Sequence, residues 1–317
     1  MGEEVVAVPV SERGLVGVLH SPATPGPHPA VLVLGGSEGL VPEHAAARLA
    51  GEGYAALALA FFGPPPLPRD LVEIPLEYGT AALEWLARHR GTDPERIAVL
   101  GRSRGGELAL LLAAAHPELV GGVVAYVPSS VAWQAVPSDP RATMAAPRSS
   151  WSRGGSPVPF VPMAPPTAAD AAAFAGFLDG EPMSFRSFFE RAMEQDAAVR
   201  AATIEVERIG GPVLVLSGGR DELWPSGPFG DRITARLADH GHPFPHRHLS
   251  YPDAGHLLGV PGTASRRRRS GFDRLRMGGS PETDEAASRD AWPRVLDVLA
   301  SARSRPAARP RADGPGR

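Results

Sequence analysis

The stretch Gly101-Arg102-Ser103-Arg104-Gly105 places a serine between two glycines, after an apolar run and before an Ala- and Leu-rich segment. The pattern Gly-x-Ser-x-Gly is typical of a sharp turn from a strand into a helix, where the serine hydroxyl is exposed as a nucleophile. Glycines two residues before and after the serine remove side chains that would collide at such a turn. We therefore predict that Ser103 is a nucleophile, and the simpler alternative is that it only caps the helix.

A serine hydroxyl becomes reactive when a neighbouring base takes its proton and a carboxylate orients that base. Asp221 follows the apolar run 213–216 in a glycine-rich turn, and His256 follows the run 248–251 on a loop. Glu222 is an alternative acid, but Asp221 lies nearer the end of its strand. The order serine, aspartate, histidine along the chain is that of an α/β-hydrolase.

Negative charge on the oxygen of a substrate carbonyl would need two backbone N–H donors near Ser103. In an α/β-hydrolase one donor is the residue after the nucleophile, which here is Arg104. The other comes from the loop after the third strand, where the sequence Leu-Gly-Gly-Ser-Glu-Gly offers Gly36 or Ser37. Both residues stay open as the second donor of this oxyanion hole.

Short apolar runs alternate with segments of helical period, which is typical of an α/β fold with a mostly parallel sheet. Helices are predicted near residues 42–51, with Pro42 just inside the start, and at 75–90 and 106–115. Asp93-Pro94 is expected to break the chain before the fifth strand. Eight strands are predicted, at residues 5–10, 15–20, 30–34, 54–60, 96–100, 122–127, 212–216 and 246–251.

A long insertion, roughly residues 128–200, separates the sixth and seventh strands. Its first half is rich in Pro, Ser and Gly and predicts a loop, whereas residues 185–202 predict one or two helices. An insertion of this length is usually a functional lid or disordered, and a lid is predicted here. Residues 304–317 predict a disordered tail, which leaves 1–303 as a single α/β-hydrolase domain.

The composition excludes several kinds of chemistry and partner. Cysteine is absent, which excludes disulfides and thiolate catalysis, and lysine is absent, which excludes Schiff-base chemistry. A net charge of −3 gives no reason to expect nucleic acid or an anionic membrane as a partner. No apolar run approaches the roughly 18 residues of a membrane span, and the N-terminus lacks a signal-peptide pattern, so we expect the cytoplasm.

Two clusters of basic residues remain. His240, His242, His246 and His248 match no standard zinc spacing, so we predict neither a metal nor a cofactor. The arginine run at 266–269 predicts a solvated loop. The alternative is a contact with the phosphates of a nucleotide-bearing substrate such as coenzyme A.

Several segments together resemble the catalytic domain of the acyl-CoA thioesterase and bile acid-CoA:amino acid N-acyltransferase family. The resemblance covers roughly residues 28–300 and rests on LGGSEGLVPEHAAARLAGEGYAALALAFFG, LEYGTAALEWL, VLGRSRGGELAL, IEVERIGGPVLVLSGGRDELWPS, HGHPFPHRHLSYPDAGH and GGSPETDEAASRDAWPRVLDVL. It implies an α/β-hydrolase fold close to the dienelactone hydrolases, with Ser103, Asp221 and His256 as nucleophile, acid and base. The acyltransferase members use a cysteine nucleophile, so a serine favours water as the acyl acceptor.

The sequence therefore predicts a serine hydrolase that cleaves an acyl thioester, such as an acyl-CoA, through an acyl-enzyme. One alternative is hydrolysis of a carboxylic ester or lactone, as the dienelactone hydrolase resemblance implies. A second alternative is transfer of the acyl group to an amine or alcohol. A third is a protein of the same fold that binds its ligand without catalysis.

Overall fold

The computed structural model describes residues 4–137, 146–263 and 274–303. Within them, an eight-stranded sheet has the order β1-β2-β4-β3-β6-β7-β10-β11. The six strands from β4 to β11 pair in parallel, whereas β2 runs antiparallel to both β1 and β4. The strands are β1 (Val5–Val10), β2 (Val16–Pro22), β3 (His28–Leu34), β4 (Ala55–Ala60), β6 (Thr92–Arg102), β7 (Val123–Tyr126), β10 (Val213–Gly218) and β11 (His246–Tyr251).

The predicted fold class and all eight predicted strands are confirmed, with one difference in β6. The expected break at Asp93-Pro94 is wrong, because both residues lie inside this strand. The pairing of β6 with β3 is irregular there: Pro29 pairs with Asp93, and the next residue, Ala30, pairs with Ile97. Proline is tolerated in a strand at such an irregularity because no regular ladder hydrogen bond is lost.

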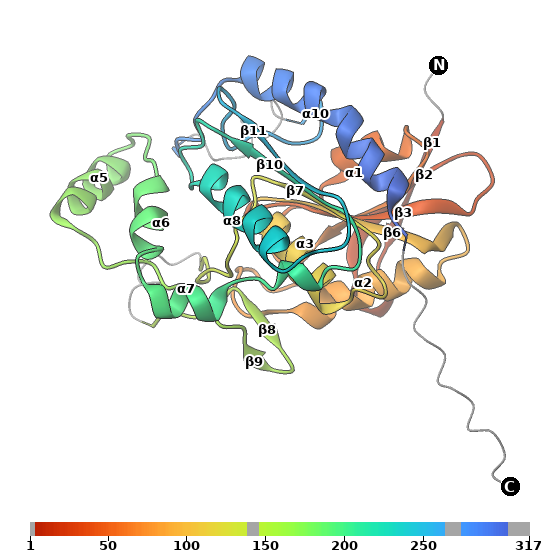
Figure 1. The fold of residues 1–317 in the computed structure, drawn as a ribbon, viewed down its shortest axis with the longest axis horizontal. Helices are drawn as coiled ribbons and strands as arrows, with labels where there is room; N and C mark the ends of the chain where they lie inside the picture. Colours follow the sequence, from red (N-terminus) through yellow and green to blue (C-terminus); the bar gives the residue numbers. More distant parts are fainter. Residues whose placement is uncertain (1–3, 138–145, 264–273, 304–317) are drawn as a thin grey trace, which may run out of the picture.

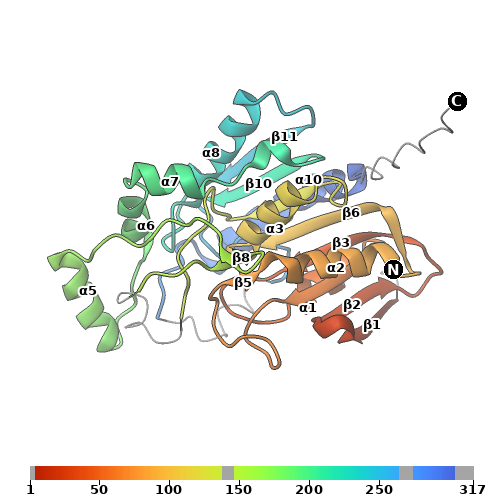
Figure 2. The ribbon, with the colours of Figure 1, turned by 90° about the horizontal axis from the view of Figure 1, so that it is seen from below.

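Helices cover both faces of the sheet (Figures 1 and 2). Helices α2 (Leu76–Arg88), α3 (Arg104–Ala115) and α8 (Ser226–Asp239) pack on one face. Helices α1 (Glu43–Ala50) and α10 (Pro281–Ser301) pack on the other. Pro42 is the residue that precedes α1 rather than its first helical residue, and α3 begins at Arg104, earlier than predicted.

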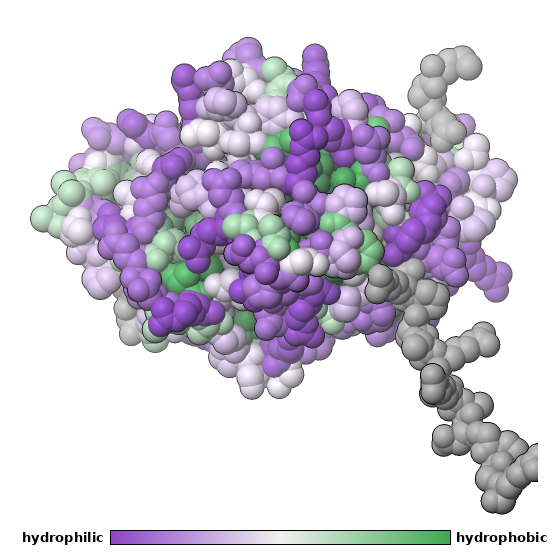
Figure 3. Space-filling model, in the orientation of Figure 1, coloured by the Kyte–Doolittle hydropathy of each residue, from purple (hydrophilic) through white to green (hydrophobic). Residues whose placement is uncertain are grey.

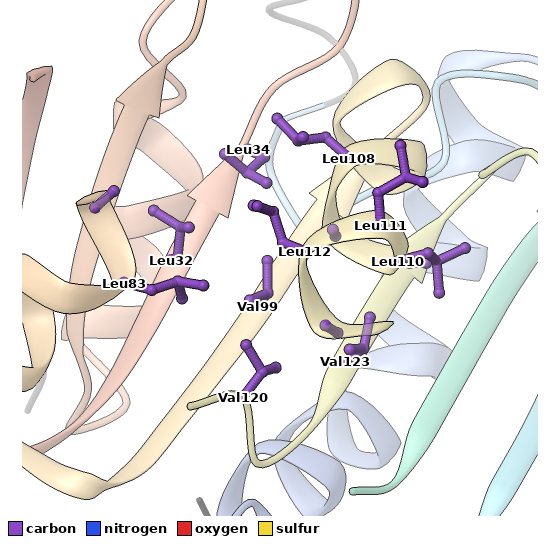
Figure 4. Packing of buried hydrophobic residues seen from close by; sticks show 14 of the residues in the cluster. Leu32, Leu34, Leu83, Val99, Leu108, Leu110, Leu111, Leu112, Val120 and Val123 are labelled. Atoms are coloured by element: carbon purple, nitrogen blue, oxygen red, sulfur yellow. The ribbon is translucent and has the colours of Figure 1, made fainter. Parts of the chain in front are cut away.

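Helix α3 is buried on nearly all sides and fixes the position of the turn that precedes it. Its leucines pack against Val99 of β6, Val123 of β7 and Leu32 and Leu34 of β3 (Figure 4). Each fully buried leucine contributes about 1.5–3 kcal/mol of hydrophobic stabilisation. Helix α2 approaches α3 so closely that a Cβ added at Gly79 would lie 2.6 Å from a methyl group of Leu112.

The insertion between β7 and β10 contains more regular structure than its sequence predicts. The expectation of a loop in its first half is wrong in part, because β8 (Trp151–Arg153) and β9 (Ser156–Pro157) form a small sheet with β5 (Ile74–Pro75). Helix α5 (Ala168–Leu178), which was not predicted, starts from a capping box between Thr167 and Asp170. The predicted helical second half contains α6 (Arg186–Ala192) and α7 (Asp196–Ala202). These three helices lie to one side of the central sheet (Figure 1).

The face of the molecule in Figure 3 is mostly hydrophilic, with apolar residues in scattered patches. Scattered apolar residues are normal on protein surfaces. In the part of the chain that the structure describes, no helix is both long and apolar enough to cross a membrane. The arginine run at 266–269 and the predicted tail 304–317 lie outside the described residues.

Candidate active site

Ser103 occupies the strained turn that its flanking glycines predict. Its backbone dihedrals are φ 54° and ψ −121°, in a region that a residue with a side chain rarely adopts. A Cβ added at Gly101 would lie 2.0 Å from the Gly105 carbonyl oxygen, and one added at Gly105 would lie 1.9 Å from the Gly35 carbonyl oxygen. Ser103 precedes α3 but makes no side-chain capping hydrogen bond, which argues against the alternative that it only caps the helix.

The structure brings the three predicted residues together from three strand ends. Ser103 lies between β6 and α3, Asp221 follows β10, and His256 follows β11. The distance from Ser103 Oγ to His256 Nε2 is 2.9 Å, and that from His256 Nδ1 to Asp221 Oδ2 is 2.8 Å. Since β6, β7, β10 and β11 are adjacent parallel strands, their carboxyl ends meet at one edge of the sheet. The arrangement allows the imidazole to take the serine proton while the carboxylate holds the ring.

The acid is held by its own loop and by helix α6. Asp221 Oδ1 accepts hydrogen bonds from the backbone N–H groups of Leu223 at 3.0 Å and Trp224 at 3.2 Å. The side chain of Arg186 donates to the backbone carbonyl of Asp221 at 2.9 Å. The rival acid, Glu222, does not bond to the imidazole, because His256 Nδ1 bonds to Asp221. Arg186 was not predicted, since nothing in its local sequence indicates a contact across 35 residues.

The two predicted sources of oxyanion donors lie beside Ser103. Arg104 is the first residue of α3, so its backbone N–H has no partner within that helix. Gly36 packs directly on Ser103, because a Cβ added to it would lie 3.3 Å from the Cβ of Ser103. Ser37 is the next residue of the same loop, and it is partly exposed. The choice between Gly36 and Ser37 as the second donor stays a prediction.

The side chain of Arg104 points away from this chemistry into a buried ion pair. Its guanidinium donates to Glu107 at 2.7 Å and to the carbonyl of Gln134 at 3.1 Å. Glu107 is completely buried and accepts from the backbone N–H of Trp133 at 3.0 Å and the indole N–H of Trp151 at 2.5 Å. Burial raises the pKa of Glu107 and lowers that of Arg104, and each partner opposes the shift of the other. The pair thus fastens the insertion to the first turn of α3.

The ring of Trp224, on the loop of Asp221, packs against His256, and the ring of Phe189 from the insertion packs against Trp224. Ser103 is 2% exposed and His256 1%. The ring of Trp224 contacts that of His256 edge-on with centroids 5.6 Å apart, and the ring of Phe189 from α6 contacts Trp224 at 5.5 Å. Two clefts, of about 420 and 350 Å³, lie elsewhere and are not lined by Ser103 or His256.

The histidines of the cluster 240–248 bond to separate partners. His240, His242 and His246 each bond to a backbone carbonyl oxygen. His248 forms a second Ser–His–Asp array, 2.7 Å from Ser217 Oγ and 2.9 Å from Asp231. Ser217 is completely buried within β10 and has no strained turn, so this array stabilises the contact of α8 with the sheet. Among the described residues, no group of three or more His, Asp or Glu side chains is arranged to hold a metal ion.

Comparison with known proteins identifies relatives over most of the chain. The profile of the family described as BAAT / Acyl-CoA thioester hydrolase C terminal matches residues 74–302. Mouse mitochondrial acyl-coenzyme A thioesterase 2 is 28% identical over 296 residues, which cover 90% of this chain and 58% of that protein. Mouse peroxisomal succinyl-coenzyme A thioesterase is 28% identical over 304 residues, which cover 93% of this chain and 65% of that protein. This chain therefore spans less than two thirds of the length of these relatives.

A solved structure supports the fold independently. The crystal structure of a putative dienelactone hydrolase from Klebsiella pneumoniae superposes with a TM-score of 0.55 at 19% identity, covering 94% of this chain and 98% of that one. At this level of identity the likeness concerns the fold alone. The family profile, in contrast, matches most of the sequence and contains Ser103, Asp221 and His256 in its matched range. The chain belongs to the BAAT / acyl-CoA thioester hydrolase C-terminal family and has the α/β-hydrolase fold.

Proposed function

We propose that this protein is a serine hydrolase that cleaves acyl thioesters of the acyl-CoA class. The observation that carries the proposal is the hydrogen-bonded series from Ser103 through His256 to Asp221 at a strained turn. Membership of the family and the names of its thioesterase relatives support the substrate class. Catalysis in the cytoplasm, without a metal or cofactor, stays a prediction.

In the acylation step, Ser103 Oγ attacks the carbonyl carbon of the thioester and His256 Nε2 takes the serine proton. The negative charge that develops on the carbonyl oxygen is stabilised by the backbone N–H of Arg104 and by that of Gly36 or Ser37. The carbon–sulfur bond then breaks, and the protonated imidazole returns the proton to the leaving thiolate. The products of this half-reaction are a free thiol and an ester of the acyl group with Ser103.

In the deacylation step, water attacks the acyl-enzyme and gives its proton to the His256 imidazole. A second oxyanion forms in the same position and collapses, which releases the carboxylic acid and returns the proton to Ser103 Oγ. The Asp221 carboxylate accepts from the Nδ1 side of the imidazole throughout and stabilises its protonated form. One residue thus acts as base and then as acid in both half-reactions.

The insertion between β7 and β10 is proposed as the lid of this site. Helix α6 rests on the acid loop through the contact of Phe189 with Trp224 and the bond from Arg186 to Asp221. Because Ser103 and His256 are almost fully buried and α6 packs on the adjacent acid loop, movement of α6 is the proposed route of access for an acyl chain. A lid that closes over the acyl-enzyme would also exclude competing acceptors from the ester.

The decisive measurement is the release of free thiol from a panel of acyl-CoAs, which ranges from succinyl-CoA to long-chain acyl-CoAs. A thiol-reactive dye detects the thiol. The protein contributes no background because it contains no cysteine. Ser103→Ala should lower kcat by about 10⁴-fold or more. Retention of more than about a tenth of wild-type activity would refute the serine mechanism.

Two alternatives give different products in the same experiments. Absence of thiol release, with Ser103-dependent turnover of p-nitrophenyl esters, would indicate an ester or lactone hydrolase instead. Acyl transfer would yield an amide or ester when an amine or alcohol competes with water. Thiol release with free acid as the other product supports the thioesterase proposal.

A further inference from the structure

We propose that Arg102 and Glu38 form a positioning pair that ties the oxyanion loop to the nucleophile turn and the base loop. The inference rests on the proposed function, because it concerns how Ser103 reacts, but it does not depend on the identity of the leaving group. Neither residue was singled out by its sequence, and neither touches the reacting atoms in the mechanism above. Both belong to segments that meet at Ser103 from different parts of the chain.

The pair lies across the loop that supplies the second oxyanion donor. Arg102 Nη2 lies 3.0 Å from both carboxylate oxygens of Glu38, and the two side chains are 7% and 13% exposed. Gly36 is enclosed beneath them: a Cβ added to it would lie 2.6 Å from Glu38 Oε2 and 3.0 Å from Arg102 Nη2. The ion pair therefore packs Gly36 against Ser103, in the loop whose Gly36 or Ser37 N–H would donate to the substrate carbonyl oxygen.

The same guanidinium also reaches the base loop. Arg102 Nη1 donates to the backbone carbonyl of His256 at 3.4 Å. Arg102 is itself the residue before Ser103, so one planar and permanently charged group joins three segments that the reaction needs in register. Its Nε atom is buried with no hydrogen-bond partner among the described residues, so the polar contacts of this guanidinium are made through its two terminal nitrogens.

The guanidinium contacts the backbone of His256 and the carboxylate lies over Gly36 of the oxyanion loop, so the two opposite charges lie between the base loop and the oxyanion loop. A lone carboxylate there would favour the protonated imidazole and disfavour the oxyanion, whereas a lone guanidinium would do the reverse. The other charged groups beside His256 are Asp221, which bonds to its imidazole, and Arg186, which bonds to the backbone of Asp221. Both are unchanged in every variant, so their electrostatic effect on the imidazole is the same throughout. The pair gives rigidity without a net charge, and removal of either partner should leave an electrostatic signature of opposite sign.

The test is the rate at which a fluorophosphonate labels Ser103 across the pH range, with the labelled peptide identified by mass spectrometry. The variants are Arg102→Met, Glu38→Gln, the double variant and Arg102→Lys. Labelling needs the neutral base, so the rate falls on the acid side of the profile. The exposed pair of Arg88 with Glu84 on α2 gives matched controls, Arg88→Met and Glu84→Gln, far from the site. Circular dichroism of each variant reports whether it folds.

We expect Arg102→Met to move the acid-side midpoint up by about 0.5 pH unit and Glu38→Gln to move it down by a similar amount. The double variant should return to the wild-type midpoint but label about tenfold more slowly, since the loops are no longer joined. Arg102→Lys should keep the wild-type acid-side midpoint, because the charge remains, but it should label Ser103 more slowly. The control variants should match wild type in both quantities.

Three kinds of result would overturn the inference. Single variants that label at the wild-type rate with the wild-type profile would show that the pair positions nothing. If the single variants label more slowly but keep the wild-type midpoint, the pair is purely structural. The same conclusion follows if the single variants do not fold while the double variant labels as wild type does. If wild type labels at Ser103 but releases no thiol from any acyl-CoA, the thioesterase proposal fails and the pair is still tested. If wild type does not label at all, both fail.

Discussion

Replacement of Glu107 by glutamine tests how the insertion is joined to the nucleophile turn. The carboxylate of Glu107 accepts from Arg104, from the backbone of Trp133 and from the indole of Trp151, and it is completely buried. In Glu107→Gln the Arg104 guanidinium stays buried without its counter-charge. Removal of one partner from a buried ion pair typically costs about 3–5 kcal/mol, against less than about 1 kcal/mol for an exposed pair. The amide oxygen can still accept one of the bonds, so we expect a loss near the lower limit.

The loss should appear in thermal or urea denaturation of the purified variant. At about 2–4 °C for each kcal/mol in a domain of this size class, the midpoint should fall by about 6–12 °C. The matched control is Glu84→Gln on the exposed face of α2, which breaks the surface pair with Arg88 and should change the midpoint by at most about 4 °C. A double variant, Arg104→Met with Glu107→Leu, should be less destabilised than Glu107→Gln because it leaves no buried charge.

A loss below about 1 kcal/mol in Glu107→Gln would refute this reasoning. Burial raises the pKa of the Glu107 carboxyl, whereas Arg104 and the two tryptophan N–H groups oppose this shift, and we expect them to keep the carboxyl ionised. A glutamine that fits at no cost would mean that the carboxyl is already neutral in the folded protein. The pair would then be a hydrogen bond rather than an ion pair.

Three further predictions concern the acid, the turn and Tyr251 at the end of β11. Asp221→Asn should lower kcat by about 10⁴-fold, whereas Glu222→Gln should stay within about twofold of wild type. The two variants are compared by steady-state kinetics on one thioester. Equal losses of kcat would reject Asp221 as the acid. Gly105→Ala should reduce the yield of folded protein and abolish activity, because its methyl group would lie 1.9 Å from the Gly35 carbonyl oxygen; a normal thermal midpoint would contradict this packing. Burial and a nearby aspartate raise the pKa of Tyr251 from 10.0 to about 12, so the alkaline phenolate titration of Tyr251→Phe should lack a component near pH 12 that wild type shows. Because this folded pKa lies above the unfolded value, the stability it contributes is present below pH 10 and is lost as pH rises toward about 12, and Tyr251→Phe should show a smaller loss over that range.

The parts of the fold that the sequence predicts are those in which local pattern and long-range packing agree. The strands of the sheet are short apolar runs bounded by polar or glycine-rich turns, so each could be recognised without knowing its neighbours. Ser103, Asp221 and His256 follow directly after such runs. Their approach in space then follows from the order of parallel strands, whose carboxyl ends share one edge. The three site residues could be predicted from their positions after strand ends more than from their residue types.

The features that escaped prediction depend on partners distant in the chain. Arg102, Arg104 and Arg186 are all arginines in polar surroundings, where the local sequence predicts a solvated side chain. Each is instead directed by a carboxylate or carbonyl that the fold brings to it, across 64 residues in the bond between Arg102 and Glu38. One local signal was available for Glu107, which is a single acid in an otherwise apolar stretch of α3. Such a residue must find a buried partner, because an unpaired buried charge is very costly.

The way helix α6 is attached to the acid loop bears on how the proposed lid could open. Arg186 donates to the backbone carbonyl of Asp221, and Ser184 donates to that of Glu222. The carboxylate itself is held by the N–H groups of Leu223 and Trp224, which belong to the acid loop. Departure of α6 therefore breaks bonds to the outer side of the loop and leaves the bonds that orient the carboxylate. The acid can stay in place while the site is uncovered, so access for substrate and alignment of His256 are compatible.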